Sequence, residues 1–555
     1  MKSQLMKNKI ALVLILISAY LIRIFGINWD QGFHLHPDER MLIMVADRID
    51  FFKNLNPNFF NYGSLPIYLL KGLSQLTDFL FNKDLANYAG MLTVGRKLSI
   101  FFDLITIFLI YKIVRLLFKE HKIAFFSSLI YAIAFFPIQN SHFFVVDVLL
   151  NTLISGLIYF LLIYLKSSSK IKIIILSLVF SAMMATKFTS IIFYPFIIGI
   201  LLFKNYKKWK DLFINLIIFH FPFLVFYFLM MPYAFIESGK FFIDIKDQLR
   251  MNSNPYIFPY TLQYVDTLPY LYYLKNIFLW GLGPIISVLS LIGFFNIGKF
   301  LIFNFQFFIK SKSSNLKNKN PFQILNFEFK IIFFFFYLLY FMIMGQSAVK
   351  FMRYMLPLYP FFAILAGYGF YKIYRLNKGY VYPIFLICLL WSFMFMSIFS
   401  FQNTRVSATD WILDHVPKKS TLAVEHWDDR LPLNQSEDYN FEELALYNLP
   451  DDEIKWQILN EKLKKTDYII IASNRLYVPL QKLADCKKFK SCYPKTSQYY
   501  QKLFENKLSF RKVVEFSVYP NFQILNFKFQ INDDSADESF TVYDHPKIII
   551  FKKMN

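Results

Sequence analysis

Groups that can do acid–base chemistry are concentrated in one polar stretch, which reads Phe-His-Leu-His-Pro-Asp-Glu-Arg and ends at Arg40. Its adjacent carboxylates, Asp38 and Glu39, can accept a proton from a reacting hydroxyl. Its imidazoles, His34 and His36, can bind a metal, and the Arg40 guanidinium can bind phosphate. The stretch follows the first long apolar segment, so we expect these groups where membrane and water meet. Taken alone, a solvated loop before a helix explains them equally well.

A second acidic residue lies near the outer end of a later apolar segment. The chain reads Gln-Asn-Ser-His-Phe-Phe-Val-Val-Asp from Gln139, which places Asp147 about one helical turn below the surface. A carboxylate at that depth is costly unless it is paired or hydrated, which favours a functional role. The alternative is a carboxylate that satisfies free amides at a helix N-terminus.

Four cations are predicted on the same outer side, where positively charged residues are otherwise scarce. They are Arg96, Lys187, Lys350 and Arg353. An anionic ligand at the outer face would account for the set. Each one alone is also explained by a side chain that reaches toward lipid phosphates.

The composition is that of a membrane protein. Of 555 residues, 56% are hydrophobic and 20% are aromatic, and the mean hydropathy is +0.39. The formal net charge of +22 does not indicate nucleic-acid binding, because most basic residues lie in short loops between apolar runs. The 17 glycines form no glycine-rich phosphate loop, so ATP-driven transport and nicotinamide chemistry are poor candidates.

Apolar runs of bilayer length recur over the first 400 positions and predict about eleven spans. They lie at about residues 10–24, 96–118, 123–138, 145–165, 171–186, 188–203, 211–231, 277–303, 328–346, 354–374 and 379–401. We interpret the first as an uncleaved helix rather than a signal peptide. The outer loops are then residues 26–95, with an interfacial helix over 65–81, and residues 232–276.

Positive charge alternates between loops and sets the predicted orientation. The basic loops are 119–122, 166–172, 204–210, 310–319 and 372–378. They place the N-terminus in the cytoplasm, and an odd number of spans places the C-terminal region outside with Asp38.

Residues 403–555 lose the long apolar runs and alternate short helices and strands, which predicts a soluble α/β domain whose last strand spans residues 540–551. A strand predicted at 421–427 ends in a polar cluster that includes Glu425 and Asp428, a common ligand position in such domains. A solvated loop is the favoured interpretation of that cluster. Cys486 and Cys492 can pair only if the domain faces an oxidising compartment.

Several motifs in chain order resemble one family. They are His36-Pro37-Asp38-Glu39 after the first span, Gly95-Arg96-Lys97, Ser141-His142 with Asp147, Ala185-Thr186-Lys187, and Lys350-Phe351-Met352-Arg353-Tyr354. Residues 8–402 resemble the integral-membrane GT-C glycosyltransferases, nearest the family-39 protein O-mannosyltransferases and aminoarabinose transferases. The resemblance implies a helix bundle over residues 1–402 with a catalytic role.

The resemblance also implies the chemistry: a polyprenyl-phosphate-linked sugar donor, a hydroxyl acceptor, and single displacement with inversion at the outer face of the plasma (inner) membrane. Asp38 is the expected base, and Glu39 and Asp147 would orient the acceptor. The four outer cations would hold the donor phosphate. Residues expected near the acceptor are His36, Arg40, His142, Glu425 and Asp428, and a divalent metal, if used, would be held among His34, His36, Asp38, Glu39 and Asp147.

Two other classes of function compete with an enzyme. A transporter or flippase for an anionic lipid would also use outer cations and a membrane-embedded aspartate, but transporters usually place such groups near the midplane of repeated halves. A receptor would not need so many spans. We therefore favour a glycosyltransferase that works on membrane lipid and an unidentified hydroxyl acceptor.

Overall fold

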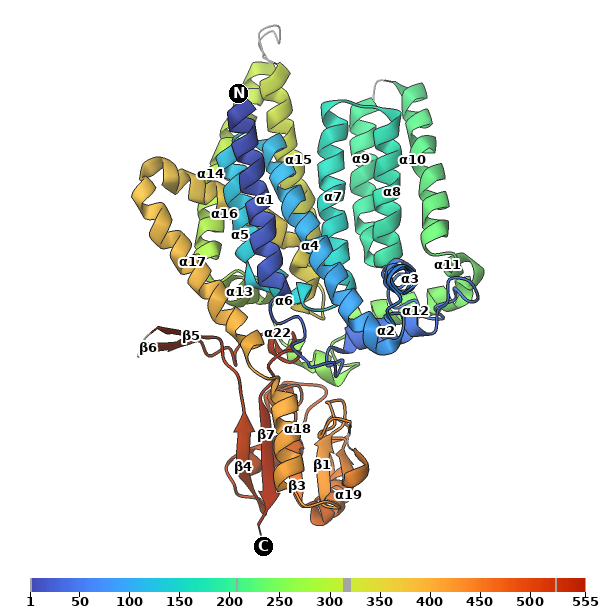
Figure 1. The fold of residues 1–555 in the computed structure, drawn as a ribbon, viewed down its shortest axis with the longest axis vertical. Coiled ribbons are helices and arrows are strands. Elements are labelled where there is room, and N and C mark those ends of the chain that lie inside the picture. The colour runs from blue at the N-terminus through green and yellow to red at the C-terminus, as the bar shows by residue number, and fades with distance from the viewer. Residues whose placement is uncertain (1, 206–207, 313–320, 435, 525–526, 555) are drawn as a thin grey trace.

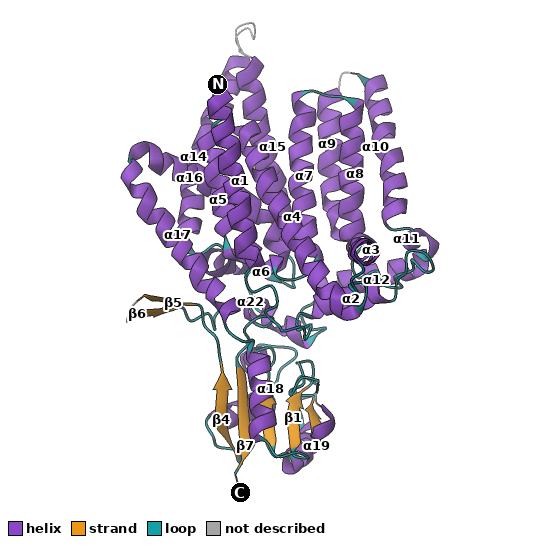
Figure 2. Ribbon diagram, in the orientation of Figure 1, coloured by secondary structure: helices purple, strands orange, loops and turns teal. Residues whose placement is uncertain are grey.

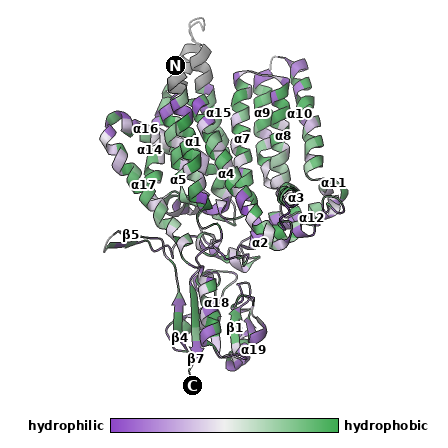
Figure 3. Cartoon of the chain, in the orientation of Figure 1, coloured by the Kyte–Doolittle hydropathy of each residue, from purple (hydrophilic) through white to green (hydrophobic). Residues whose placement is uncertain are grey.

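The strands lie in the C-terminal part of this computed structural model, which describes residues 2–205, 208–312, 321–434, 436–524 and 527–554 (Figures 1 and 2). Long helices stand side by side in one bundle, and the C-terminal part forms a sheet below it. The mainly α membrane bundle with a C-terminal sheet-containing domain, predicted above, is confirmed. Hydrophobic residues cover the bundle helices along their length (Figure 3).

Each predicted apolar segment contains one long helix of the bundle. These helices are α1 (Lys2–Ile24), α4 (Tyr88–Leu117), α5 (His121–Ile133), α7 (Val146–Lys166), α8 (Lys170–Thr186), α9 (Tyr194–Asn205), α10 (Trp209–Met230), α14 (Pro284–Lys312), α15 (Pro321–Met344), α16 (Tyr359–Leu376) and α17 (Val381–Met396). Within the described residues, 6 helices pass a length and composition test for crossing a membrane. A seventh passes if α5 and the bent α6 (Phe135–Ser141) form one span. The figure of eleven spans therefore stays a prediction.

Buried charge marks the contact between α1 and α4. Arg23 Nε donates to Asp103 Oδ2 at 2.6 Å, and the exposed fractions of the two side chains are 0% and 2%. The Tyr131 hydroxyl of α5 also donates to Asp103, at 2.7 Å. Because an unpaired charge is costly in an apolar core, this network fixes how the three helices meet.

The first outer loop packs two helices under the bundle. They are α2 (Pro37–Asp47) and α3 (Ser64–Phe81), and α3 lies crosswise to the bundle helices (Figure 1). The helix predicted over 65–81 is thus present. The Gly63 amide donates to the Thr186 carbonyl at 3.0 Å, and a Cβ on Gly63 would lie 1.8 Å from the Ala185 carbonyl oxygen. This close approach holds the loop against the end of α8, beside Lys187.

The second outer loop is built of short helices. They are α11 (Tyr233–Ile236), α12 (Ser238–Ser253), the 3₁₀-helix η2 (Pro259–Tyr264) and α13 (Leu271–Asn276), followed by the π-helix η3 (Ile277–Gly281). Further 3₁₀-helices occur at η1 (Phe188–Phe193), η5 (Met352–Leu358), η6 (Lys378–Tyr380) and η7 (Ser397–Ser400). The segment 313–319 of the predicted basic loop lies outside the described residues.

The C-terminal region is organised around a five-stranded mixed sheet in the order β2-β1-β3-β7-β4. The strands β1 (Thr421–Glu425), β2 (Asn440–Leu444) and β3 (Tyr468–Ile471) are parallel, whereas β7 (Ile548–Lys553) and β4 (Phe510–Phe516) run antiparallel to their neighbours. The helices are α18 (Thr404–His415), the 3₁₀-helix η8 (Ser436–Asp438), α19 (Glu453–Lys465), α20 (Tyr477–Lys482), α21 (Pro494–Phe504) and α22 (Glu538–Thr541).

One strand prediction was too long. The chain was expected to be extended from Phe540, but α22 precedes β7, which begins only at Ile548. The difference arises because Asp537 caps α22 by accepting from the Ser539 amide at 2.8 Å. A separate hairpin of β5 (Asn521–Ile524) and β6 (Phe527–Gln530) was not predicted.

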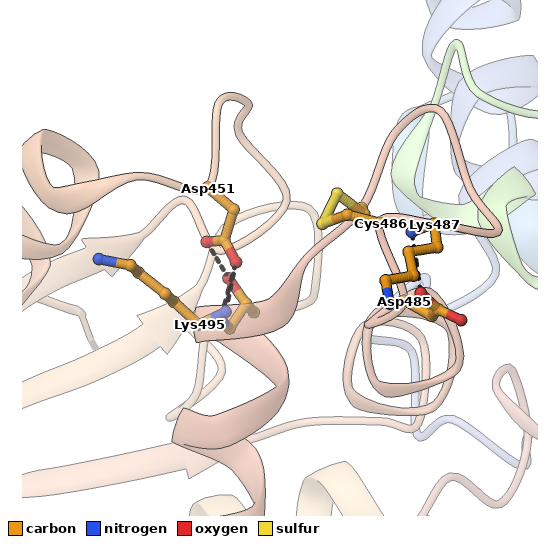
Figure 4. The surroundings of a disulfide bond; sticks show 7 residues. Asp451, Asp485, Cys486, Lys487 and Lys495 are labelled. Atoms are coloured by element: carbon orange, nitrogen blue, oxygen red, sulfur yellow. Dashed lines mark hydrogen bonds between the residues drawn. A yellow bond between two sulfur atoms is a disulfide. The ribbon is translucent and has the colours of Figure 1, made fainter.

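Cys486 and Cys492 form a disulfide across a separation of 6 residues (Figure 4). Near it, Asp485 accepts from the Lys487 amide at 2.8 Å, and Asp451 accepts from the Lys495 amide at 2.8 Å. The bond closes the short loop between α20 and α21.

The segment between β6 and β7 joins the C-terminal region to the bundle. His545 is buried between Asp533 and Asp544, with nitrogen-to-oxygen distances of 2.9 and 2.5 Å. Asp544 also accepts from the Gln139 amide of α6 at 2.9 Å. Burial lowers the pKa of His545, but the two aspartates outweigh it and raise the pKa to about 10. A charged imidazolium therefore links this segment to α6.

The first prediction concerns pH. The pKa of His545 in the folded protein lies above its ordinary value of 6.5. The charged imidazole therefore stabilises the folded state fully below pH 6.5, and this stabilisation is lost as pH rises toward about 10. Thermal unfolding of the purified protein should show this decline. His545→Gln should lower stability at pH 6 and flatten the decline, while His415→Gln, on the exposed end of α18, should not. An unchanged decline in His545→Gln would contradict the assignment.

The second prediction concerns orientation. The basic loops predict that the C-terminal region is extracytoplasmic, and the loops 119–122 and 166–172 lie at the bundle end away from it (Figure 1). A cysteine at Lys418, whose side chain is 77% exposed, should react with an impermeant reagent in intact cells. A cysteine at Lys208, which is 75% exposed in the loop before α10, should react only after lysis. Labelling at Lys208 in intact cells would reverse the orientation.

Candidate functional site

A cavity of about 490 Å³ lies between the outer loops of the bundle and the C-terminal region. The bundle side contributes Asp38, Tyr62 and Arg353 to its wall. The C-terminal side contributes residues that come from four separate segments: Arg405, Trp427, Arg475 and Tyr543. The cavity therefore forms only when the two parts of the chain meet.

Asp38 is the carboxylate that reaches this cavity. It lies in the first turn of α2, where Pro37 begins the helix and the free amides favour a negative charge. Its side chain is 24% exposed and forms an ion pair with Arg353. Asp38 is thus held in place yet open to a molecule in the cavity.

Asp147 lies beneath Arg353, in the first turn of α7. Its Oδ1 accepts from Lys187 Nζ at 2.8 Å, and its Oδ2 lies 3.8 Å from Arg353 Nε. Arg353 therefore bridges the two aspartates. The structure brings together Asp38, Asp147, Lys187 and Arg353, although they come from four elements far apart in the sequence.

Aromatic rings flank the two cations. Lys187 Nζ lies 4.6 Å from the Tyr354 ring centre, and Arg353 lies 4.8 Å from that of Phe351. Such faces stabilise a cation without neutralising it. Lys350 does not join this group: its ammonium donates to the Ala348 carbonyl at 3.2 Å, and burial lowers its pKa.

Glu39 and Arg96 form a different, fully buried network. Arg96 donates to both oxygens of Glu39, at 3.0 and 2.8 Å, and to both oxygens of Asp30, at 2.9 and 2.8 Å. The exposed fractions are 0% for both acids and 1% for Arg96. In this arrangement neither Glu39 nor Arg96 reaches the cavity, which corrects their expected contact with substrate.

The histidines have structural partners. His36 caps α2 by accepting from the Glu39 amide at 3.4 Å and packs on Phe143 and Tyr543. Burial, followed by the nearby arginines, lowers its pKa well below the usual value. His34 stacks on Tyr88, and the two ring nitrogens of His142 lie 2.9 and 2.8 Å from backbone carbonyl oxygens.

The five predicted metal ligands therefore do not converge. Asp38 and Asp147 both pair with Arg353, Glu39 pairs with Arg96, and the two histidines pack on aromatic rings. Within the described parts of the chain, no group of three or more His, Cys, Asp or Glu side chains has a metal-binding arrangement.

Predicted acceptor residues divide between wall and core. Arg40 and Asp428 line the cavity, and Arg40 lies 3.7 Å from Asp429. Glu425 does not line it: its carboxylate is buried in the sheet, accepts from the Tyr500 hydroxyl at 2.5 Å, and has its pKa raised to about 8 by burial.

Sequence reasoning missed several wall residues. Arg475 pairs with Glu538 at 2.7 Å, and the half-buried Tyr62 and the buried Tyr543 line the same cavity as Arg353. Their isolated positions carry no spacing signal. Trp427 is distinguished only in the structure, where its φ of 78° is rare for an aromatic residue and marks a strained position.

An apolar groove of about 450 Å³ runs between α9 and α15. Its walls include Phe196, Phe203 and Phe335. A ladder of aromatic rings connects this groove with the charged side chains around Arg353. The rings contact one another in the order Phe196, Phe336, Phe193 and Tyr340. The Tyr340 hydroxyl donates to the Tyr354 carbonyl, beside Lys187.

Comparison with solved structures identifies the fold. The Archaeoglobus fulgidus oligosaccharyltransferase tethered with an acceptor peptide superposes with a TM-score of 0.53 and 11% identity, covering 95% of this chain and 74% of that one. The oligosaccharyltransferase AglB from Archaeoglobus fulgidus, in complex with an inhibitory peptide and a dolichol-phosphate, gives a TM-score of 0.50 and 10% identity, covering 94% of this chain and 74% of that one. The protein has the GT-C fold. The resemblance stated from sequence is confirmed at this level.

Other comparisons cover less of this protein. Residues 90–232 match a family model described as dolichyl-phosphate-mannose-protein mannosyltransferase. ArnT from Cupriavidus metallidurans bound to undecaprenyl phosphate gives a TM-score of 0.45 and 13% identity, with 72% of each chain covered. No curated protein sequence gives a significant match.

The third prediction separates the two adjacent acids Asp38 and Glu39. Glu39→Ala should lower the free energy of unfolding by roughly 3–5 kcal/mol, because it leaves the buried Arg96 with only Asp30 as a charged partner. Asp38→Ala should cost far less, since its side chain is 24% exposed. Thermal unfolding in one detergent compares them, and equal destabilisation would refute a purely buried role for Glu39.

Proposed function

We propose that this protein is a membrane glycosyltransferase that moves a sugar from a polyprenyl-phosphate donor to an acceptor hydroxyl. One observation carries the proposal: Asp38 lines the cavity and is joined through Arg353 to Asp147 and Lys187. A carboxylate and two cations at a membrane interface are what such a transfer needs, because the phosphate is already a good leaving group.

The donor would use the cations and the apolar groove together. Lys187 and Arg353 would bind the phosphate, and the polyprenyl tail would lie between α9 and α15, whose groove approaches Lys187 through the ring ladder. A dolichol-phosphate is bound in the solved AglB, which shares this fold. The long tail stays in lipid while the sugar enters the cavity.

The reaction would be a single displacement with inversion. Asp38 would accept the proton of the acceptor hydroxyl while the oxygen of that hydroxyl forms a bond to the anomeric carbon. The bond between that carbon and the phosphate oxygen breaks, and the electron pair leaves with the phosphate. Lys187 and Arg353 would stabilise the negative charge there. Asp147 would orient both cations rather than touch the sugar.

Glu39 and Arg96 are reassigned as positioning residues, since their buried contacts keep them from the cavity. Lys350 and Glu425 are not needed by this mechanism. His36 would act through the cap of α2, on which the position of Asp38 depends. A divalent metal is not required for any of these steps.

Residues 403–555 would help to select the acceptor, whereas residues 1–402 would perform the transfer. This division is supported by the cavity wall, where the C-terminal side provides Arg405, Trp427 and Arg475. The disulfide supports an extracytoplasmic position for this region, because such bonds persist in oxidising compartments. The membrane would then be the plasma (inner) membrane, with transfer at its outer face.

The fourth prediction tests the base. Asp38→Asn should slow transfer by roughly 10² to 10⁴, because the amide keeps the shape but accepts no proton. The assay follows labelled polyprenyl-linked sugars into product in reconstituted membranes. Asp47→Asn, on the exposed end of the same helix, is the matched control and should keep full activity.

Two further results decide between alternatives. Lys187→Ala should weaken donor binding, whereas Asp38→Asn should leave donor binding unchanged. Undiminished transfer by Asp38→Asn would remove Asp38 as the base. If wild type moves lipid-linked sugar across the bilayer but forms no glycosylated product, the protein is a transporter and the proposed function is wrong.

A further inference from the structure

The β5–β6 hairpin stands apart from the rest of the C-terminal region. It forms its own two-stranded sheet and pairs with no strand of the five-stranded sheet. It projects sideways from the C-terminal end of α17 (Figure 1). A two-stranded hairpin alone is marginally stable in water, so its order calls for another surface.

The register makes the hairpin amphipathic. Phe522 lies opposite Phe529, while Gln523 lies opposite Lys528. Opposite residues share a face and successive residues alternate, so Phe527 joins the two phenylalanines on one face. The other face carries polar side chains.

The aromatic face is left uncovered by the protein. Phe527 is 70% exposed and Phe529 is 57% exposed. Two such rings next to each other are unusual on a water-facing surface. Phe522 of this face lines an apolar groove of about 590 Å³ between the hairpin and the bundle, together with Asn521 and Gln523 of the other face.

That groove belongs to the lipid-facing side of the bundle. Leu21 of α1 and Phe393 of α17 also line it, and they are 59% and 44% exposed. The hairpin is fixed here because the Asn521 amide donates to Ser397 Oγ at 3.1 Å, just beyond α17. The base of the hairpin therefore lies beside the membrane-facing helix surface, and Phe527 and Phe529 are exposed next to it.

We propose that the β5–β6 hairpin is a membrane-surface anchor whose phenylalanines enter the lipid of the outer leaflet. The polar face, with Lys528, lies toward water and headgroups. Aromatic rings favour this interfacial layer, and the groove below offers space for an acyl chain. Lipid is the occupant because the groove is continuous with exposed apolar residues of two bundle helices.

The anchor has a consequence for the cavity. The chain after β6 leads directly into the segment that carries Glu538 and Tyr543, two wall residues. The hairpin would therefore fix the C-terminal wall relative to the membrane surface as well as to the bundle. This contact with lipid does not depend on the reaction proposed above.

The fifth prediction uses the full chain with Cys388→Ser and its disulfide intact. Single cysteines replace Phe527, Phe529 or, as a polar-face control, Gln530, and each carries an environment-sensitive fluorophore. In phosphatidylcholine and phosphatidylglycerol vesicles with a nitroxide high on the acyl chain, the labels at 527 and 529 should be blue-shifted and quenched. The label at 530 should be neither.

A second comparison guards against a label that enters lipid by itself. With the reporter at 529, Phe527→Asp should remove most of the quenching, whereas Gln530→Asp should keep it. Equal weak quenching at all three positions would overturn the anchor. A blue shift without lipid quenching that disappears as the protein is diluted in the vesicles would also overturn it, and would indicate a second copy of the chain instead.

Discussion

The fully buried guanidinium of Arg96 is the constraint on which the candidate site depends. A charge in an apolar bundle is tolerated only with close partners, and Arg96 has Glu39, Asp30 and the Ile27 carbonyl. Glu39 also accepts from the Phe144 amide at 2.8 Å, just before α7 and its Asp147. One cation therefore fixes the start of α2 and the start of α7, the two helix ends that carry the aspartates of the cavity network.

This arrangement gives two neighbouring acids opposite roles. Asp38 and Glu39 follow each other in the first turn of α2, so their side chains point in different directions. Glu39 turns into the bundle and binds Arg96, whereas Asp38 turns toward the cavity and meets Arg353. The buried ion pair of Glu39 holds the start of α2 rigidly, and this keeps Asp38 in place at the cavity, as a proton acceptor requires.

The cavity lies where three environments meet: the bundle, the C-terminal region and an apolar groove that leads toward lipid. Because Asp38 and Trp427 line it from opposite sides, neither part of the chain forms the cavity alone. The segment from Asp533 to His545 holds the two parts together through Gln139. A lipid-linked reactant and a water-borne one can both approach such a position.

The sequence by itself determined the helices of the bundle and the placement of Asp38 and Asp147 near the bundle end that meets the C-terminal region. These follow from local properties: apolar runs of bilayer length, charge in loops and proline at a helix start. It predicted Lys187 and Arg353 among the outer cations for the same reason. It could not assign partners, so Arg96, Lys350 and Glu425 were expected at the site although they lie elsewhere.

Only the tertiary structure decided which charges are buried together and which face the cavity. Contacts such as Arg96 to Glu39 or Arg353 to Asp38 join residues that are distant in the chain, and their choice depends on helix packing rather than on local pattern. The hairpin's membrane-directed face likewise depends on strand register and on its contact with α17. Burial and pairing are properties of the folded whole, because the energy of a charge is set by its surroundings and not by its position in the sequence.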